Sequence, residues 1–104
     1  MRKGTEINMS YESKLKNKEA DDLFKAILLL ETEEDCYRFF EDLCTIKELQ
    51  AISQRFQVAK LLSEKKTYSE IEDVTKASTA TISRVNRCLV YGADGYQMML
   101  ERMK

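Results

Sequence analysis

The stretch TYSEIEDVTKASTATISRV, residues 67–85, decides how this chain folds. Thr67 followed by Glu70 predicts a helix start, because the threonine oxygen accepts the Glu70 amide while the glutamate reaches back to the Thr67 amide. Ser78 is suited to cap a second helix after a three-residue break, Lys-Ala-Ser. A short helix, a tight break and a second helix form the helix-turn-helix plan, which we place at about residues 67–89.

Apolar and polar residues divide this stretch into a packing side and a reading side. The apolar residues spaced to pack the two helices together are Ile71, Ala77, Ile82 and Val85. The second helix begins with small and hydroxyl-bearing residues, which suit a helix pressed against bases because hydroxyls hydrogen-bond and methyl groups touch thymine. The stretch therefore predicts a DNA-reading head. The contact residues that we expect are Ser69, Lys76, Thr79, Ala80, Thr81, Ser83, Arg84 and Arg87.

Several residues of this head depart from the usual composition of such motifs. Glu72 stands where many have alanine, Thr75 replaces an apolar residue, and Lys76 stands where the turn usually has glycine. A left-handed backbone at that lysine would cost about 1–2 kcal/mol. Together with Glu70 and Asp73, Glu72 would also repel phosphate if it faced DNA. We therefore expect a modest affinity, or one that depends on the N-terminal arm.

The rest of the chain also reads as helical. It has no proline, only three glycines and 43% hydrophobic residues, whereas sheets joined by tight turns need more turn residues. Helix signals predict an all-α chain of six helices, two of which form the helix-turn-helix. The other four are expected at about residues 19–30, from a Thr32 cap to about residue 43, from a Thr45–Glu48 capping box to about residue 63, and from Asp94 with Gln97, after a stop at Gly92. The third helix carries its apolar stripe at Leu49, Ile52, Phe56, Ala59 and Leu62.

Length and charge indicate one domain with an uneven charge distribution. We expect a flexible polar arm at residues 1–18 and a single helical domain at residues 19–104. The net charge of −1 conceals +3 over residues 1–18, −7 over residues 19–54 and +3 over residues 55–91. Because phosphate responds to local potential, this division allows the C-terminal half to bind nucleic acid.

Residue types argue against an enzyme, a metal site and a cofactor. Histidine is absent and the three cysteines, Cys36, Cys44 and Cys88, have no CxxC spacing, so we interpret them as small buried hydrophobes in a reducing cytoplasm. A nucleophilic Cys36 or Cys44 is the enzymatic alternative, but no histidine is available to activate a thiol. The longest apolar run, residues 26–30, is far too short to span a membrane. We expect a cytoplasmic protein.

Aromatic residues are too numerous for a few short helices of one small monomer. They are Phe24, Tyr37, Phe39, Phe40 and Phe56. An ordinary core accounts for most of them, and an intersubunit core is the alternative that accounts for the excess. A homodimer would also serve a DNA reader, because two-fold symmetry doubles the contacts.

Two segments carry a resemblance to a known family. DLCTIKELQAISQR, residues 42–55, and ASTATISR, residues 77–84, resemble the Trp repressor superfamily, and residues 23–103 look like its TrpR-like branch of the YerC/YecD type. The resemblance implies an intertwined, all-α homodimer that binds double-stranded DNA at a palindromic operator as a transcriptional regulator, and as a repressor. The alternative is a helical protein–protein interaction module that has kept the fold without reading DNA.

The resemblance also implies a candidate effector pocket. Arg55 and Arg84 match the two arginines that hold tryptophan in the family's best-known member, and Thr45 matches a threonine near the ligand carboxylate. Val85 stands in place of a glycine and Cys88 in place of a serine. The candidate pocket is therefore Thr45, Arg55, Arg84 and Cys88, and any small-molecule corepressor is expected not to be tryptophan.

Overall fold

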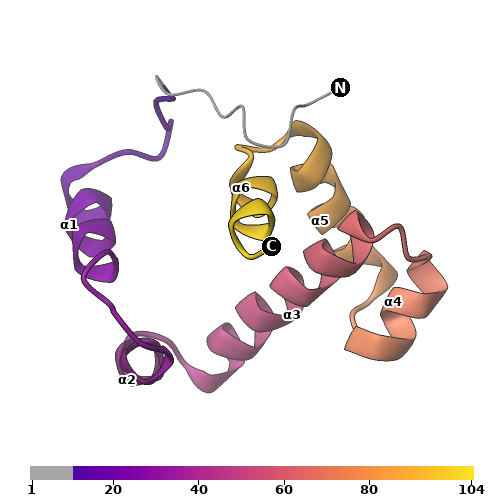
Figure 1. Cartoon of the computed structure of the whole chain (residues 1–104), viewed down its shortest axis with the longest axis horizontal. Coiled ribbons are helices and arrows are strands. Elements are labelled where there is room, and N and C mark those ends of the chain that lie inside the picture. The colour runs from indigo at the N-terminus through magenta and orange to yellow at the C-terminus, as the bar shows by residue number, and fades with distance from the viewer. Residues whose placement is uncertain (1–10) are drawn as a thin grey trace. The chain divides into compact units, whose positions relative to one another are not determined.

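The computed structural model describes residues 11–104, and in this part of the chain every regular element is a helix (Figure 1). The helices are α1 (Lys18–Ile27), α2 (Glu33–Leu43), α3 (Ile46–Ser63), α4 (Tyr68–Thr75), α5 (Thr79–Tyr91) and α6 (Gly95–Arg102). The all-α fold with six helices is confirmed. In residues 11–104 no helix is both long enough and apolar enough to cross a membrane.

The chain divides into two compact units, which we call the N-terminal unit (residues 11–49 of the described chain) and the C-terminal unit (residues 50–104). The predicted arm, residues 1–18, falls partly outside the described residues, because these begin at residue 11. Its flexibility stays a prediction.

Side-chain caps start the helices where the sequence places them. Thr32 Oγ1 accepts the Asp35 amide at 3.0 Å, and Thr45 with Glu48 forms a reciprocal capping box at the start of α3. Thr67 with Glu70 forms the same box at α4. Each cap satisfies amide groups that a helix leaves unpaired in its first turn, so these boundaries follow from local sequence.

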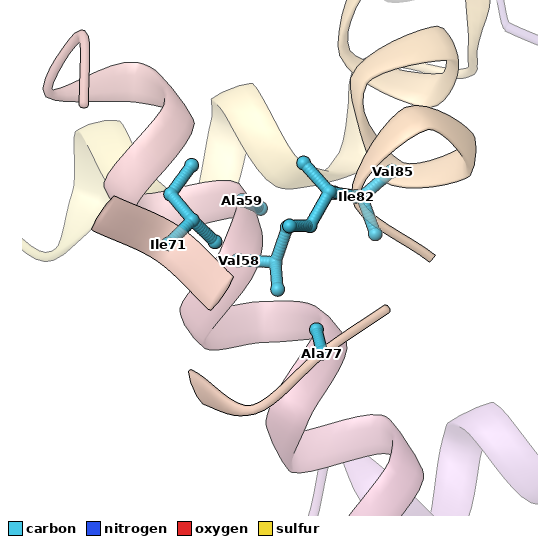
Figure 2. Packing of buried hydrophobic residues seen from close by; sticks show 6 residues of the cluster. All are labelled: Val58, Ala59, Ile71, Ala77, Ile82 and Val85. Carbon is cyan, nitrogen blue, oxygen red and sulfur yellow. The ribbon is translucent and has the colours of Figure 1, made fainter. Parts of the chain in front are cut away.

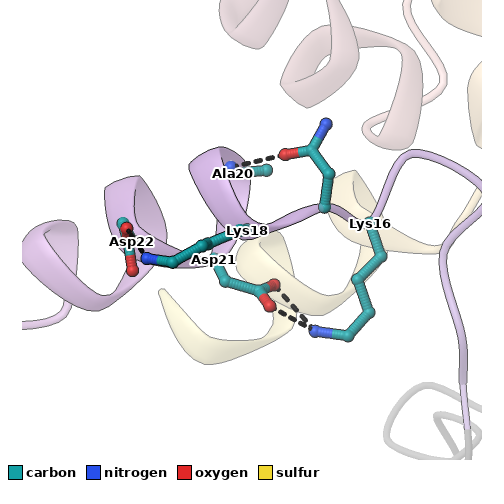
Figure 3. A network of polar contacts seen from close by, with 6 residues as sticks. Lys16, Lys18, Ala20, Asp21 and Asp22 are labelled. Atoms are coloured by element: carbon teal, nitrogen blue, oxygen red, sulfur yellow. Dashed lines mark hydrogen bonds and ion pairs between the residues drawn. The ribbon is translucent and has the colours of Figure 1, made fainter.

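The two ends of α1 differ from the expectation. Asn17, not anticipated as a cap, accepts the Ala20 amide at 2.7 Å. Lys16, the preceding residue, pairs with Asp21 at 2.7 Å, an exposed ion pair that contributes little stability (Figure 3). The helix ends at Ile27 rather than residue 30, because the amides of Leu29 and Leu30 donate to carbonyls three residues back, a tightening common at helix ends.

The buried core lies entirely in the C-terminal unit. Its residues, drawn in Figure 2, are Val58 and Ala59 of α3, Ile71 of α4, Ala77 of the turn, and Ile82 and Val85 of α5. Leu61, Leu62, Tyr68 and Tyr96 are partly buried against this cluster. The four residues predicted to join the two helices of the head are all buried, so that prediction is confirmed. Val58 lies outside the apolar stripe that we predicted for α3.

The N-terminal unit has helices without a core. None of its described residues is buried, and Phe24, Leu28 and Tyr37 are 58%, 82% and 63% exposed. Both α1 and α2 nevertheless gather their apolar residues on one side. Such an amphipathic helix ordinarily places that side against another element.

The last helix starts by a different device from the one predicted. Gly92 ends α5 as expected, in an extended conformation, and a Cβ at this position would collide with the Cys88 carbonyl. Asp94 occupies the N-cap position of α6, so the predicted start of this helix is confirmed, but its side chain makes no capping hydrogen bond. Asp94 instead takes a left-handed backbone conformation with φ of 70°, which redirects the chain into α6. Aspartate is among the few residues that tolerate this conformation.

Candidate nucleic-acid interface

The two faces of α5 are clearly separated. Ile82 and Val85 are buried, at 0% and 1% exposure. The exposed residues over the same turns are Thr79, Ala80, Ser83, Arg84 and Arg87, which we call the outer face of α5. At 3.6 residues a turn these five span about 140° of the helix, opposite the buried pair. The outer face is therefore held outward by the core and free to meet a ligand.

In the turn between α4 and α5, a lysine has the left-handed backbone conformation. Lys76 has φ of 62°, and its amide donates to the Glu72 carbonyl at 2.9 Å. A lysine pays about 1–2 kcal/mol for this conformation relative to glycine. Neighbouring contacts must therefore hold the turn in place.

Thr75 supplies those contacts. Its hydroxyl donates to the Ile71 carbonyl at 2.7 Å and accepts the Ala77 amide at 3.1 Å. Its carbonyl accepts Gln54 Nε2 at 3.0 Å, which ties the turn to α3. Each such bond is worth about 0.5–1.5 kcal/mol, enough together to offset the Lys76 conformation. Sequence reasoning missed this role, although the hydroxyl of a threonine near a helix end commonly bonds the carbonyl four residues back.

The hydroxyls at the start of α5 are already engaged within the protein. Ser78 Oγ accepts the Thr81 amide and donates to Thr81 Oγ1, both at 3.1 Å, so half-buried Thr81 belongs to the cap. Thr79 Oγ1 donates to Glu72 Oε1 at 2.6 Å. Glu72, for which the sequence predicts only repulsion of phosphate, therefore also holds Thr79, the first residue of α5.

Charged side chains of both signs surround the outer face. Lys76, Arg84 and Arg87 are exposed, as is Ser69 on α4. Glu70 has its pKa lowered from the usual 4.5, chiefly by the hydrogen bond from the Thr67 amide and then by that of the Thr67 hydroxyl. Its carboxylate thus serves the start of α4. All the expected DNA contacts except the half-buried Thr81 are therefore exposed, and their role in binding stays a prediction.

The candidate effector pocket takes residues from both units. Cys88 lines an apolar hollow of about 440 Å³ together with Phe56, Tyr96 and Met99. The residues lining this hollow do not include Arg55, which is half-buried, or Arg84, which is exposed. Thr45 belongs to the N-terminal unit and caps α3. The effector pocket therefore remains a prediction.

No cluster of metal-ligating side chains occurs among residues 11–104, and the three cysteines are free thiols. Cys36 and Cys88 are exposed and Cys44 is half-buried, so the prediction that the cysteines are buried is wrong for the single chain.

Comparisons with known proteins give one consistent result. The family model described as Trp repressor protein matches residues 18–104. YerC of Bacillus subtilis (strain 168), a protein without a characterised function, is 59% identical over 91 residues, which cover 88% of each chain. A crystal structure of a candidate Trp repressor from Staphylococcus aureus is 56% identical, with a TM-score of 0.83 over 86% of this chain and 90% of that one. A TrpR-like protein from Eubacterium eligens ATCC 27750 is also 56% identical, with a TM-score of 0.84 over 86% and 93%.

Proposed function

This chain belongs to the Trp repressor family, and on that premise we propose that it is a sequence-specific DNA-binding transcriptional regulator that acts as a repressor. The family is one of regulators rather than enzymes. The regulator would act by occupying a promoter through α4 and α5. No step of this action requires a cofactor or a chemical reaction.

The observation that carries the proposal is the outer face of α5. Its residues are small, hydroxyl-bearing or basic, and the core beneath keeps them turned outward. Such a helix matches the major groove, where short side chains approach base edges and arginines reach phosphate or guanine. Arg84 and Arg87 lie later on the same face, where each can neutralise a phosphate.

We propose that the regulator is a homodimer that reads a palindromic operator. The apolar residues of α1 and α2 have no core within their own unit, and a second copy of this chain is the partner that the resemblance to the family implies. Two heads related by a two-fold axis would meet two half-sites about one helical turn of DNA apart. The operator would therefore be a pseudo-palindrome.

A salt series on duplex DNA tests this function. The full chain should bind a random-sequence duplex with an affinity that falls steeply as salt rises, measured by fluorescence anisotropy. Arg87→Ala should weaken binding to all sequences and flatten the plot of log affinity against log salt by about one unit for each head. Arg102→Ala, which removes an exposed arginine at the end of α6, is the matched control and should leave the slope unchanged.

Absence of salt-dependent binding would favour the alternative, a helical protein–protein interaction module. One feature suits that alternative. Val74 is 70% exposed on α4, beside Glu70 and Asp73. Leu61 and Lys66 line the same hollow, and an exposed apolar residue in such a hollow fits a protein surface better than a phosphate backbone.

We assign no role to tryptophan in this function. Val85, where the family's best-known member has glycine, is buried in the core, so it cannot leave open backbone beside Arg84. Cys88 is also a poor acceptor for an ammonium group. A different small corepressor remains compatible with the proposal, and the apolar hollow beside Cys88 is where its apolar part would fit.

A further inference from the structure

A carboxylate lies at the front of the proposed reading helix. Glu72 is on α4, but its Oε1 accepts the hydroxyl of Thr79, the first residue of α5, at 2.6 Å. Both side chains are exposed. A hydroxyl donating to a carboxylate at this distance is a charge-assisted hydrogen bond, so it orients the two groups toward each other. The exposed face of the head therefore begins with an anchored negative charge.

This contact determines which hydrogen-bonding groups the pair presents to a ligand. The Thr79 proton is directed at Glu72, so the hydroxyl offers only lone pairs elsewhere. The ionised carboxylate has no proton and accepts on both oxygens. Glu72 and Thr79 together form a surface that accepts hydrogen bonds and donates none. We call this surface the acceptor pair.

The major groove offers such a pair a clear choice of bases. Cytosine presents an N4 amino donor, and acidic side chains are its usual partners. Guanine presents two acceptors, N7 and O6, and thymine presents the O4 acceptor, so both bases would place acceptors opposite the acceptors of the pair. Adenine combines its N6 donor with an acceptor at N7 and lies between these cases. The order of preference is therefore cytosine, then adenine, with guanine and thymine rejected.

We propose that Glu72 is a specificity-determining residue of the head, selecting cytosine at one position of each half-site. Thr79 is its positioning residue, because it acts by holding the carboxylate. This inference rests on the proposed function, since it requires that the outer face of α5 enter the major groove. It also reverses the first interpretation of both residues, in which Thr79 read a base directly and Glu72 only repelled phosphate.

Selection from a randomised duplex library tests the proposal with the full chain. Wild type should enrich cytosine at one position, and replacing it by guanine should weaken binding about ten- to hundredfold. Glu72→Gln keeps an oxygen acceptor but adds an amino donor, so guanine should become acceptable at that position alone. Thr79→Val keeps the shape of the side chain and loses the hydroxyl, so selectivity should fall at the same position.

A matched control separates base reading from charge. Asp73→Asn removes one negative charge from an adjacent exposed residue of α4, which lines a hollow with Lys66 and Glu70. It should raise affinity for all duplexes by a similar factor and leave the selected sequence unchanged. Glu72→Gln should differ from it by changing the preferred base.

Two results would overturn the inference while leaving the proposed function intact. In one, Glu72→Gln raises affinity for all sequences as Asp73→Asn does, which makes Glu72 a source of repulsion alone. In the other, Thr79→Val weakens binding to every sequence equally and lowers the melting temperature, which would show that the contact only stabilises the packing of α4 against α5. If wild type binds no duplex with salt dependence, the proposed function falls and the inference falls with it.

Discussion

The N-terminal and C-terminal units form helices equally well but bury their side chains very differently. The capping box of Thr45 and Glu48 has the same two distances, 2.8 and 3.1 Å, as that of Thr67 and Glu70. Yet every fully buried side chain among the described residues lies between Val58 and Val85. Good local signals therefore do not by themselves give a unit a core.

The difference shows what each unit requires in order to be stable. Ile71, Ile82 and their neighbours bury each other within one chain, so the head formed by α4 and α5 has its own packing. The apolar sides of α1 and α2 lack that packing, and short isolated helices are marginal in water. We therefore expect the stability of the head to depend on its own core, and that of the N-terminal unit on the second copy.

The largest expected effect is the loss of a core side chain from the head. Ile82→Ala removes a fully buried side chain and should lower the free energy of unfolding by about 2–5 kcal/mol, measured by urea denaturation. Val90→Ala is the control on the same helix, because Val90 is 53% exposed, and it should change stability much less. If both variants lost the same free energy of unfolding, Ile82 would not be part of a buried core.

A smaller effect, dependent on protein concentration, is expected in the N-terminal unit. Leu28→Ala should destabilise the protein by about 1–3 kcal/mol if a second copy covers this 82% exposed side chain, and by almost nothing in a monomer. Val74→Ala, at a 70% exposed position of α4, is the control. The thermal midpoint of wild type should rise with concentration, because subunits stabilise each other by mass action.

Light scattering provides the direct check on that prediction. Wild type should have twice the chain mass of 12.1 kDa across dilution, as a homodimer whose N-terminal unit is not stably folded in a free monomer. A folded 12.1 kDa species at micromolar concentration, with Leu28→Ala as stable as wild type, would show that the apolar side of α1 is not covered by a second copy.

The contrast between the units also explains what the sequence could predict. Caps at Thr32, Thr67 and Ser78 follow from neighbours three residues away, so the helix starts were predictable. The α4–α5 packing was predictable too, because its apolar spacing spans only a short segment. These signals are local, and local signals are sufficient for helix positions and for the plan of the head.

Features that depend on distant residues were not predictable in the same way. α3 has apolar residues on more than one side, so periodicity alone did not select Val58 over Ile52, which is 44% exposed. The bond from Gln54 to the Thr75 carbonyl joins residues 21 apart. The contact of Glu72 with Thr79 crosses a turn whose left-handed lysine had to be placed first. In each case the partner is set by the fold and not by the spacing.

The smallest expected effect is a pH dependence at the start of α4. The Glu70 pKa lies below its usual value of 4.5 in the folded chain, mainly because the Thr67 amide donates to the carboxylate. A lowered pKa means that folding favours the ionised form, so this stabilisation is present above the unfolded pKa and is lost as pH falls through the folded one. Glu70→Gln should therefore be less stable than wild type at pH 7, and the difference should close as pH falls below about 4.5. Urea midpoints between pH 7 and pH 3 would measure this difference in stability.

Because the main cause is a hydrogen bond and not a distant charge, the difference at pH 7 should persist in high salt. A difference that widened at low pH would mean that the carboxylate is destabilised by folding, and that the capping box does not hold it in its ionised form.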